Sequence, residues 1–161
     1  MRLSVIEGIH MNENDENAAP ALDRLKSGGK SRKGCELTAV HGKTILAIED
    51  EGMLRVYLQM MLGESGYKVI MAADGREAIQ RYMENRSEIG LVLLDMGLPE
   101  MSGEEVLSTI VRVNPGAKVV AVSGSVEPDV QASVLKIGAA DYLGKPYLAE
   151  EPLRKVDNLL H

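Results

Sequence analysis

The stretch LVLLDMGLPEMSG, residues 91–103, decides the fold. Its first four residues are apolar without alternation, which is typical of a parallel strand that is buried on both faces of a sheet. Asp95 follows at once, so this strand ends in a carboxylate. Further along, Ser102 and Glu105 have the spacing of a capping box, which predicts the start of a helix. The stretch therefore indicates a buried strand, a loop that opens with an acid, and then a helix.

Strands and helices alternate in the same way on both sides of this stretch. Short apolar runs predict four further strands, at residues 44–48, 67–71, 118–122 and 141–143. Helical spacing of apolar residues and capping signals predict helices around residues 53–62, 74–83, 102–111, 128–137 and 150–160. We expect the Met and Tyr side chains on these helices to lie in the core.

Five strands that alternate with five helices predict right-handed βαβ units and a parallel sheet covered on both faces. The strands at 44–48, 91–94 and 118–122 are the most uniformly apolar, so we expect them in the centre of the sheet. The other two strands are more mixed and suit the edges. This arrangement fits a flavodoxin-like, doubly wound α/β sheet with the strand order 2-1-3-4-5, whose working site lies at the carboxyl ends of the strands.

Acidic, hydroxyl and basic side chains follow the predicted strands at that edge. Glu49 and Asp50 come after the first strand, and Asp95 ends the third. We expect these three carboxylates to converge, and like charges so close need help to stay ionised. Oxygen ligands of this kind suit a hard divalent cation, above all Mg²⁺. A hydroxyl at Ser123 and a cation at Lys145 follow the fourth and fifth strands.

Residues 44–161 resemble the receiver domain of two-component response regulators. The matching segments are AIEDE (47–51), LVLLDMGLPEMSG (91–103), AVSGS (121–125) and GAADYLGKPY (138–147). The resemblance covers this whole region. It implies a CheY-like phosphorelay signal-transduction protein that accepts a phosphoryl group from phosphohistidine and forms 4-aspartylphosphate. Such a protein is no enzyme in the ordinary sense, since it catalyses only its own phosphotransfer and dephosphorylation.

The resemblance assigns the acceptor and the metal ligands residue by residue. Asp95 matches the phosphoacceptor, and Glu49 and Asp50 match the acidic pair that holds Mg²⁺ with it. Gly97 matches the residue whose backbone carbonyl also binds the metal. A glutamate stands at the first acidic position, where an aspartate is also found in the family, and it lengthens one arm of the metal site. Every acceptor-site position is filled, so we expect a receiver that can be phosphorylated.

Three further residues match the switching machinery of the family. Ser123 matches the switch hydroxyl, Tyr142 the switch aromatic, and Lys145 the lysine that faces the phosphoryl group. By the same resemblance the Lys145–Pro146 bond is cis. Phosphorylation is expected to draw Ser123 towards the phosphate and to let Tyr142 swing inward. The face made by the fourth helix, the fifth strand and the fifth helix changes in consequence, and the resemblance also implies a weak homodimer through this face.

The first 43 residues differ in composition from the rest of the chain. Their net charge is +1 against −7 for residues 44–161, and residues 11–34 hold few apolar side chains. Such a segment cannot offset its ordering entropy by burial, so we expect a mostly disordered, polar arm or linker before the receiver domain at 44–161. The fragments GGKS (28–31) and GKT (42–44) lack the preceding glycine of a phosphate-binding loop.

Composition limits the setting and the partners. The lone cysteine, Cys35, favours a reducing, cytoplasmic location, and no apolar run approaches the roughly 20 residues of a membrane-spanning helix. The net charge of −6 and the lack of Phe and Trp argue against direct DNA binding. The resemblance implies a sensor histidine kinase, a histidine phosphotransfer protein, or both, as partners.

Two other functions fit the sequence less well. The acids after the first strand would repel the phosphate of a flavin, and Gly97 stands where a haloacid dehalogenase-type phosphatase needs a second acid. We expect no kinase or output domain, because the chain stops at His161. A single-domain regulator is the interpretation we favour. A detached C-terminal receiver of a hybrid histidine kinase and a phosphorylation-independent interaction module remain the alternatives.

Overall fold

The computed structural model of the protein describes residues 43–125, 127–148 and 150–161. Strands and helices alternate along this part of the chain. The strands are β1 (Thr44–Ile48), β2 (Lys68–Ala72), β3 (Ile89–Asp95), β4 (Val119–Ser123) and β5 (Asp141–Gly144). The helices are α1 (Gly52–Glu64), α2 (Gly75–Asn85), α3 (Gly103–Val113), α4 (Pro128–Ile137) and α5 (Glu150–Leu160). The predicted succession of elements is confirmed.

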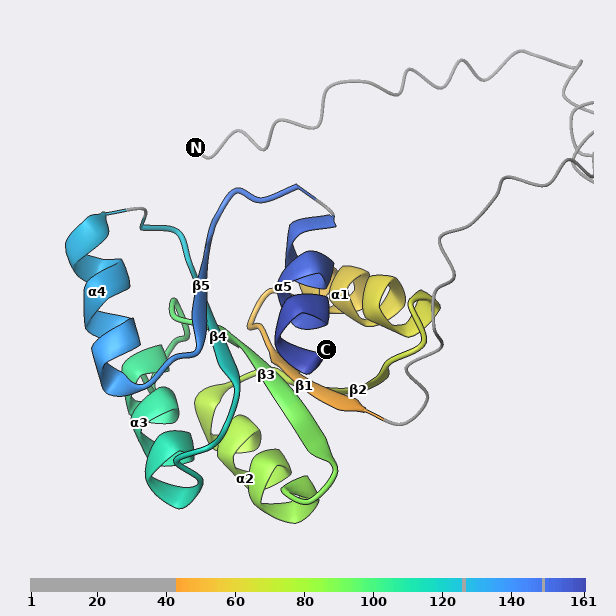
Figure 1. Ribbon diagram of the computed structural model, residues 1–161, viewed down its shortest axis with the longest axis horizontal. Helices are drawn as coiled ribbons and strands as arrows, with labels where there is room; N and C mark the ends of the chain where they lie inside the picture. Colours follow the sequence, from red (N-terminus) through yellow and green to blue (C-terminus); the bar gives the residue numbers. More distant parts are fainter. Residues whose placement is uncertain (1–42, 126, 149) are drawn as a thin grey trace, which may run out of the picture. The chain divides into compact units, whose positions relative to one another are not determined.

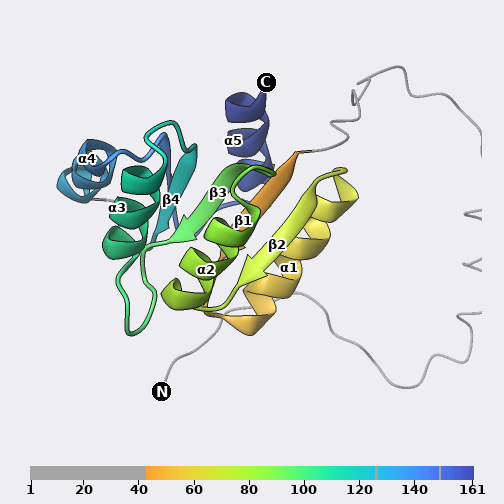
Figure 2. The ribbon, with the colours of Figure 1, turned by 90° about the horizontal axis from the view of Figure 1, so that it is seen from below.

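The strands form one parallel sheet in the order β2-β1-β3-β4-β5, which confirms the predicted flavodoxin-like arrangement. Figures 1 and 2 show β1 and β3 running side by side through the middle of the sheet. Every residue of β1 and of β4 is buried, as their unbroken apolar sequences predict for central strands. At the edge, β2 exposes Lys68. The strand order reverses between β1 and β3, so the switch point lies where two acidic strand ends meet.

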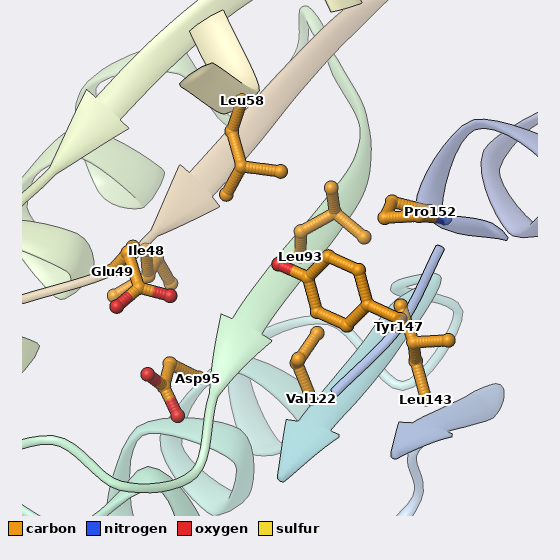
Figure 3. Close-up of a pocket in the computed structure, with 9 residues that line it drawn as sticks. All are labelled: Ile48, Glu49, Leu58, Leu93, Asp95, Val122, Leu143, Tyr147 and Pro152. Atoms are coloured by element: carbon orange, nitrogen blue, oxygen red, sulfur yellow. The ribbon is translucent and has the colours of Figure 1, made fainter. Parts of the chain in front are cut away.

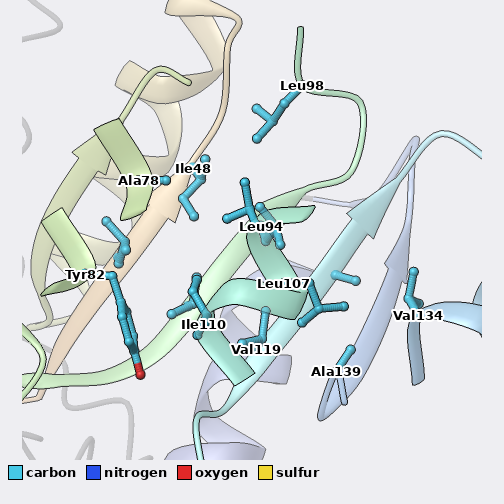
Figure 4. Close-up of a cluster of buried hydrophobic side chains, with 14 of the residues drawn as sticks. Ile48, Ala78, Tyr82, Leu94, Leu98, Leu107, Ile110, Val119, Val134 and Ala139 are labelled. Atoms are coloured by element: carbon cyan, nitrogen blue, oxygen red, sulfur yellow. The ribbon is translucent and has the colours of Figure 1, made fainter. Parts of the chain in front are cut away.

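Helices cover both faces of the sheet and enclose two separate cores. Side chains of α2, α3 and α4 pack on one face, and side chains of α1 and α5 pack on the other (Figures 1 and 2). Because successive strand residues point to opposite faces, Leu46 and Ile48 enter the first core while Ile45 and Ala47 enter the second. Figure 4 shows the first core, where Leu107 of α3 lies among strand residues. Burial of each such large apolar side chain stabilises the folded protein by about 1.5–3 kcal/mol.

The second strand begins one residue later than the sequence predicted. Gly66 has a φ of 89°, in the left-handed region, and it ends α1. The amide of Tyr67 then donates to the carbonyl of Leu62 at 3.1 Å, so Tyr67 belongs to the helix-ending turn. Its side chain is nevertheless buried in the second core, and its hydroxyl donates to Asp157 of α5.

The expectation that the helical Met and Tyr side chains lie in the core is wrong for several of them. Met53 is 80% exposed, Met83 is 52% exposed and Tyr57 is 39% exposed. For Met53 and Tyr57 the physical reason is that α1 carries apolar residues around much of its circumference, while only one side can face the sheet. That side buries Leu58 and Leu62. On the other sides of α1, Met53, Val56, Tyr57 and Met60 form an apolar surface.

The predicted polar arm at residues 1–43 lies outside the described residues, apart from Lys43. Of the helices in the described part of the chain, none has both the length and the apolar character needed to cross a membrane.

The main chain that follows Asp95 passes closely against the start of α3. Gly103, the first residue of α3, is buried there. A Cβ atom on Gly103 would lie 2.5 Å from the Cα of Met96 and 3.0 Å from the carbonyl oxygen of Asp95. Gly63, near the end of α1, has no such neighbour within 4 Å. Both glycines therefore lie in helices, but Gly103 is closely packed and Gly63 is not.

We expect the same substitution to have opposite effects at these two glycines. Gly103→Ala should lower the free energy of unfolding by about 2 kcal/mol, because backbone atoms must move to admit the methyl group. Gly63→Ala should raise it by roughly 0.5–1 kcal/mol, because alanine loses less backbone entropy in a helix. Urea unfolding measures both. A Gly103→Ala protein as stable as the wild type would contradict the close approach.

Candidate functional site

The site is built by the carboxyl ends of three strands. Ile48 of β1 pairs with Leu94 of β3, so the next residues, Glu49 and Asp95, come side by side. Both side chains follow the alternation that points Ala47 and Leu93 into the core beneath α1 and α5. Figure 3 shows the two carboxylates at the tips of these neighbouring strands, with apolar side chains to one side of them. The fold itself thus forces two acids together.

The carboxylate of Asp95 is held by one donor on each oxygen. Only 6% of the residue is exposed. The amide of Gly97 donates to Oδ1 at 2.8 Å, and the Nζ of Lys145 donates to Oδ2 at 2.7 Å. The side chain is therefore fixed in orientation, and its charge is countered by a single ammonium group.

Glu49 is more deeply buried than Asp95, with 2% of the residue exposed. Its Oε2 accepts a hydrogen bond from Lys145 Nζ at 3.1 Å, and its Oε1 accepts one from the amide of Glu51 at 3.2 Å. Burial raises the pKa of Glu49 above its usual value, and the charge of Asp95 raises it further, whereas Lys145 works against both. The site therefore holds more negative charge than its one lysine can neutralise.

Asp50 completes an acidic cluster that fits a divalent cation. One carboxylate oxygen from each of Glu49, Asp50 and Asp95 lies within 4.8 Å of the others. Asp50 is exposed, so the cluster opens to solvent on its side. Hard oxygen donors, a net negative charge and an open flank are what Mg²⁺ requires, since it keeps several of its waters when bound. The residues present therefore fit this metal.

Lys145 reaches the acids from the end of β5. The Lys145–Pro146 peptide bond is cis, as the resemblance to receiver domains implied. Burial lowers the pKa of Lys145, but its hydrogen bonds to Asp95 and Glu49 and their charges outweigh this effect and raise the pKa overall. The lysine is therefore charged at neutral pH. Because one ammonium bonds two carboxylates, it joins the ends of β1, β3 and β5.

Ser123 and Tyr142 belong to the neighbouring strands β4 and β5, and within the described residues neither side chain bonds to the carboxylates or to the Lys145 ammonium group. Ser123 is buried at the end of β4, and its Oγ accepts a hydrogen bond from the amide of Ser125 at 3.1 Å. Tyr142 of β5 is also buried, and its hydroxyl donates to the carbonyl of Ser125. Within the described residues, no hydrogen bond connects Ser123 or Tyr142 to Asp95. The tyrosine ring already occupies the inward position in this structure.

Two contributors to the site were missed by the sequence reasoning. Tyr147 lines the same small pocket as Glu49 and Asp95 (Figure 3), and burial raises the pKa of its hydroxyl. Arg55 of α1 donates two hydrogen bonds to the loop that carries the acids. A signal for Arg55 existed, because helical side chains slant towards the N-terminus and this one stands one turn after the acidic loop.

The fold and the site together define a doubly wound α/β domain with an acidic, cation-ready pocket at its carboxyl edge. Comparisons with known proteins agree with this class. The family model described as "Response regulator receiver domain" matches residues 45–157. The chemotaxis protein CheY of Thermotoga maritima is 32% identical over 119 residues, which are 73% of this chain and 95% of that protein. The chain belongs to the response regulator receiver domain family.

Solved structures support the same assignment. A response regulator receiver domain protein from Clostridium thermocellum has 29% identity and a TM-score of 0.70, and the match covers 73% of this chain and 94% of that one. The CheX–CheY complex with BeF3 and Mg from Borrelia burgdorferi has 27% identity and a TM-score of 0.71, with 74% and 90% covered. This chain is therefore a CheY-like receiver domain of two-component signalling.

The raised pKa of Glu49 predicts how the stability of the metal-free protein depends on pH. From the usual glutamate pKa up to the raised one, the folded protein keeps a proton that the unfolded chain has lost. The free energy of unfolding therefore falls as pH rises through this window, by about 1.4 kcal/mol for each pH unit between the two pKa values. In EDTA, Glu49→Gln should flatten this fall and be more stable than the wild type at about pH 8.

Urea unfolding between about pH 5 and pH 8 checks this expectation. The matched control is Glu104→Gln, because Glu104 is exposed in the first turn of α3 and is not one of the three clustered carboxylates. The control should reproduce the wild-type slope. Parallel curves for Glu49→Gln and the wild type would show that Glu49 does not titrate abnormally.

Proposed function

We propose that residues 44–161 act as a phosphoacceptor whose acceptor group is the carboxylate of Asp95. The observation that carries this proposal is the setting of Asp95, which is buried, held on both oxygens and placed beside Glu49 and Asp50. Phosphoryl transfer demands positioning and charge neutralisation more than covalent chemistry from the protein. An oriented carboxylate next to a cation site and a lysine meets both demands.

In the proposed reaction an oxygen of Asp95 attacks the phosphorus of a donor. The new bond joins this oxygen to phosphorus and yields an aspartyl phosphate. The bond that breaks is the P–N bond of a phosphohistidine, whose imidazole leaves and takes up a proton, or the P–O bond of a small acyl phosphate, whose carboxylate leaves. Hydrolysis of the aspartyl phosphate by water returns the carboxylate and releases inorganic phosphate.

Glu49, Asp50, Asp95 and the backbone carbonyl of Gly97 are the groups that we propose to hold Mg²⁺. The acidic cluster supports this, and so does the Mg in the Borrelia burgdorferi complex. When bound, the ion supplies positive charge that neutralises the carboxylates and the incoming phosphoryl oxygens. Lys145 already donates to Asp95 and supplies a second positive charge, and Ser123 supplies a hydroxyl donor.

The hydrogen bonds around Ser125 support a route from the acceptor to the surface. The amide of Ser125 donates to Ser123, and the carbonyl of Ser125 accepts from Tyr142. A phosphoryl group on Asp95 would accept a hydrogen bond from the Ser123 hydroxyl, and the turn of this side chain towards the phosphate would draw its Oγ away from the amide of Ser125. The β4–α4 loop would then adjust together with the acceptor of the tyrosine. Local charge thereby shifts the population of two arrangements of α4, β5 and α5, the proposed docking face.

The proposed donors are a sensor histidine kinase, a histidine phosphotransfer protein, or both, in the cytoplasm. The apolar surface on α1 supports docking of a protein close to the site. Met53, Val56 and Met60 are each more than half exposed, and α1 begins directly after the acidic loop. Methionine side chains adapt to a partner's shape, which suits a transient contact. We propose a single-domain regulator whose receiver is residues 44–161, with residues 1–43 as an arm or linker.

Replacement of the acceptor should abolish phosphorylation. With acetyl phosphate and Mg²⁺, the wild type should gain one phosphoryl group by intact mass, and EDTA should prevent the gain. Asp95→Asn should gain none, because an amide is a poor nucleophile. Asp129→Asn, an exposed acid in the first turn of α4, is the control and should behave as the wild type. An equal gain in Asp95→Asn would assign the acceptor elsewhere.

Loss of the Ser123 hydroxyl should separate phosphorylation from switching. Ser123→Ala should still gain the phosphoryl group, but the phosphorylation-dependent NMR shift changes in β5 and α4 should fall by more than half relative to the wild type. The reason is that alanine offers no donor to the phosphate and no acceptor to Ser125. Ser133→Ala, exposed on α4, is the control. Full shift changes in Ser123→Ala would contradict the proposed route.

A further inference from the structure

Arg55 holds the main chain of the acidic loop. One nitrogen of its guanidinium, Nη1, donates to two successive carbonyls, that of Glu49 at 2.9 Å and that of Asp50 at 2.7 Å. Each hydrogen of this nitrogen thus has its own acceptor. The bonds go to the backbone and leave the carboxylates of Glu49 and Asp50 available for other partners. Arg55 therefore fixes the position of two acids without neutralising either of them directly.

Arg55 carries its positive charge at an unfavourable place in its helix. Arg55 is the fourth residue of α1, and a positive charge near a helix N-terminus is unfavourable with respect to the helix dipole. No acid stands in the first turn of α1, and no side-chain hydrogen bond caps the helix in the part of the chain that is described. The guanidinium folds back over Gly52, where a Cβ would touch Nη2 at 3.6 Å. Its hydrogen bonds to the loop offset the unfavourable charge.

The loop requires such a constraint because its acids repel one another. Glu49, Asp50 and Asp95 lie within 4.8 Å of each other, and Lys145 contacts only Glu49 and Asp95. Asp50 is exposed at the start of the loop, so repulsion favours conformations in which it turns away. A charge-assisted hydrogen bond to its carbonyl opposes that movement.

We propose that Arg55 is a positioning residue that keeps Glu49 and Asp50 in the arrangement that binds Mg²⁺. The inference rests on the proposed function, because it assigns Arg55 a role in the same metal site. It predicts whether the loss of Arg55 strengthens or weakens the binding of Mg²⁺. If Arg55 acted only through its charge, its removal would strengthen the binding of a cation. If it positions the acids, its removal weakens binding.

The test compares Arg55→Met with Arg76→Met. Arg76 is exposed in the first turn of α2, a helix that starts at the same edge of the sheet, so its removal changes the net charge equally. Isothermal titration with Mg²⁺ should give a dissociation constant about tenfold higher for Arg55→Met than for the wild type, as for other residues that orient metal ligands. Arg76→Met should equal the wild type or bind slightly more tightly.

A second readout uses the metal-free protein. Hydrogen exchange of the Glu51 and Gly52 amides in EDTA should be faster in Arg55→Met than in Arg76→Met, at a temperature where urea unfolding shows both to be folded. Arg55→Gln, which keeps polarity and helix propensity but is too short to reach both carbonyls, is measured beside Arg55→Met in case the latter folds poorly. Weakened Mg²⁺ binding together with faster exchange supports the proposal.

The outcomes distinguish a failure of the proposed function from a failure of the role proposed for Arg55. If the folded wild type shows no Mg²⁺ binding and no Mg²⁺-dependent phosphorylation, the proposed function fails. If the wild type binds Mg²⁺ but the Arg55 variants bind it as tightly or more tightly, the proposed function stands and the positioning role of Arg55 is overturned. A loss of thermal stability with an unchanged dissociation constant in the folded variants also overturns it.

Discussion

The ion pairs of Lys145 with Glu49 and Asp95 are the interaction on which the site depends. Two carboxylates that are less than a tenth exposed share one half-buried ammonium group at 3.1 and 2.7 Å. Removal of Lys145 from this cluster would leave two buried carboxylates without a counter-charge, which costs far more than a surface ion pair contributes. The same contacts join the ends of β1, β3 and β5. The domain therefore keeps an excess of negative charge that a divalent cation is suited to balance.

The two-residue repeat of the strands divides the site into two functions. Asp95 follows Leu91 and Leu93 on the face beneath α1 and α5, and the bonds of Lys145 keep it there. Ser123 has the opposite parity, following Val119 and Ala121, whose face is covered by α3 and α4. Tyr142 shares that face. The charged groups thus lie on one side of the sheet. Ser123 and Tyr142, which we propose to respond to phosphorylation, lie on the other side.

The sequence was sufficient for the fold because its signals are local and agree with each other. Unbroken apolar runs identified the central strands, and the acids that follow them located the site without any contact information. Three features lay beyond such signals. The exposure of Met53 depends on which side of an apolar helix meets the sheet, the inward position of Tyr142 depends on a carbonyl 17 residues away, and the bonds of Arg55 depend on the path of a loop. Each depends on tertiary packing, which selects one of several sterically allowed arrangements.

The starts of the helices at this edge differ in a way that suits a switch. A side chain caps α2 through Asp74, and Ser102 and Glu105 form a capping box on α3. For α1 and α4, by contrast, the described residues provide no side-chain cap. In front of α1, Arg55 holds the preceding loop through its two backbone hydrogen bonds. The described part of the loop before α4 is instead tied through Ser125 to Ser123 and Tyr142, and these are the bonds that we propose phosphorylation to exchange.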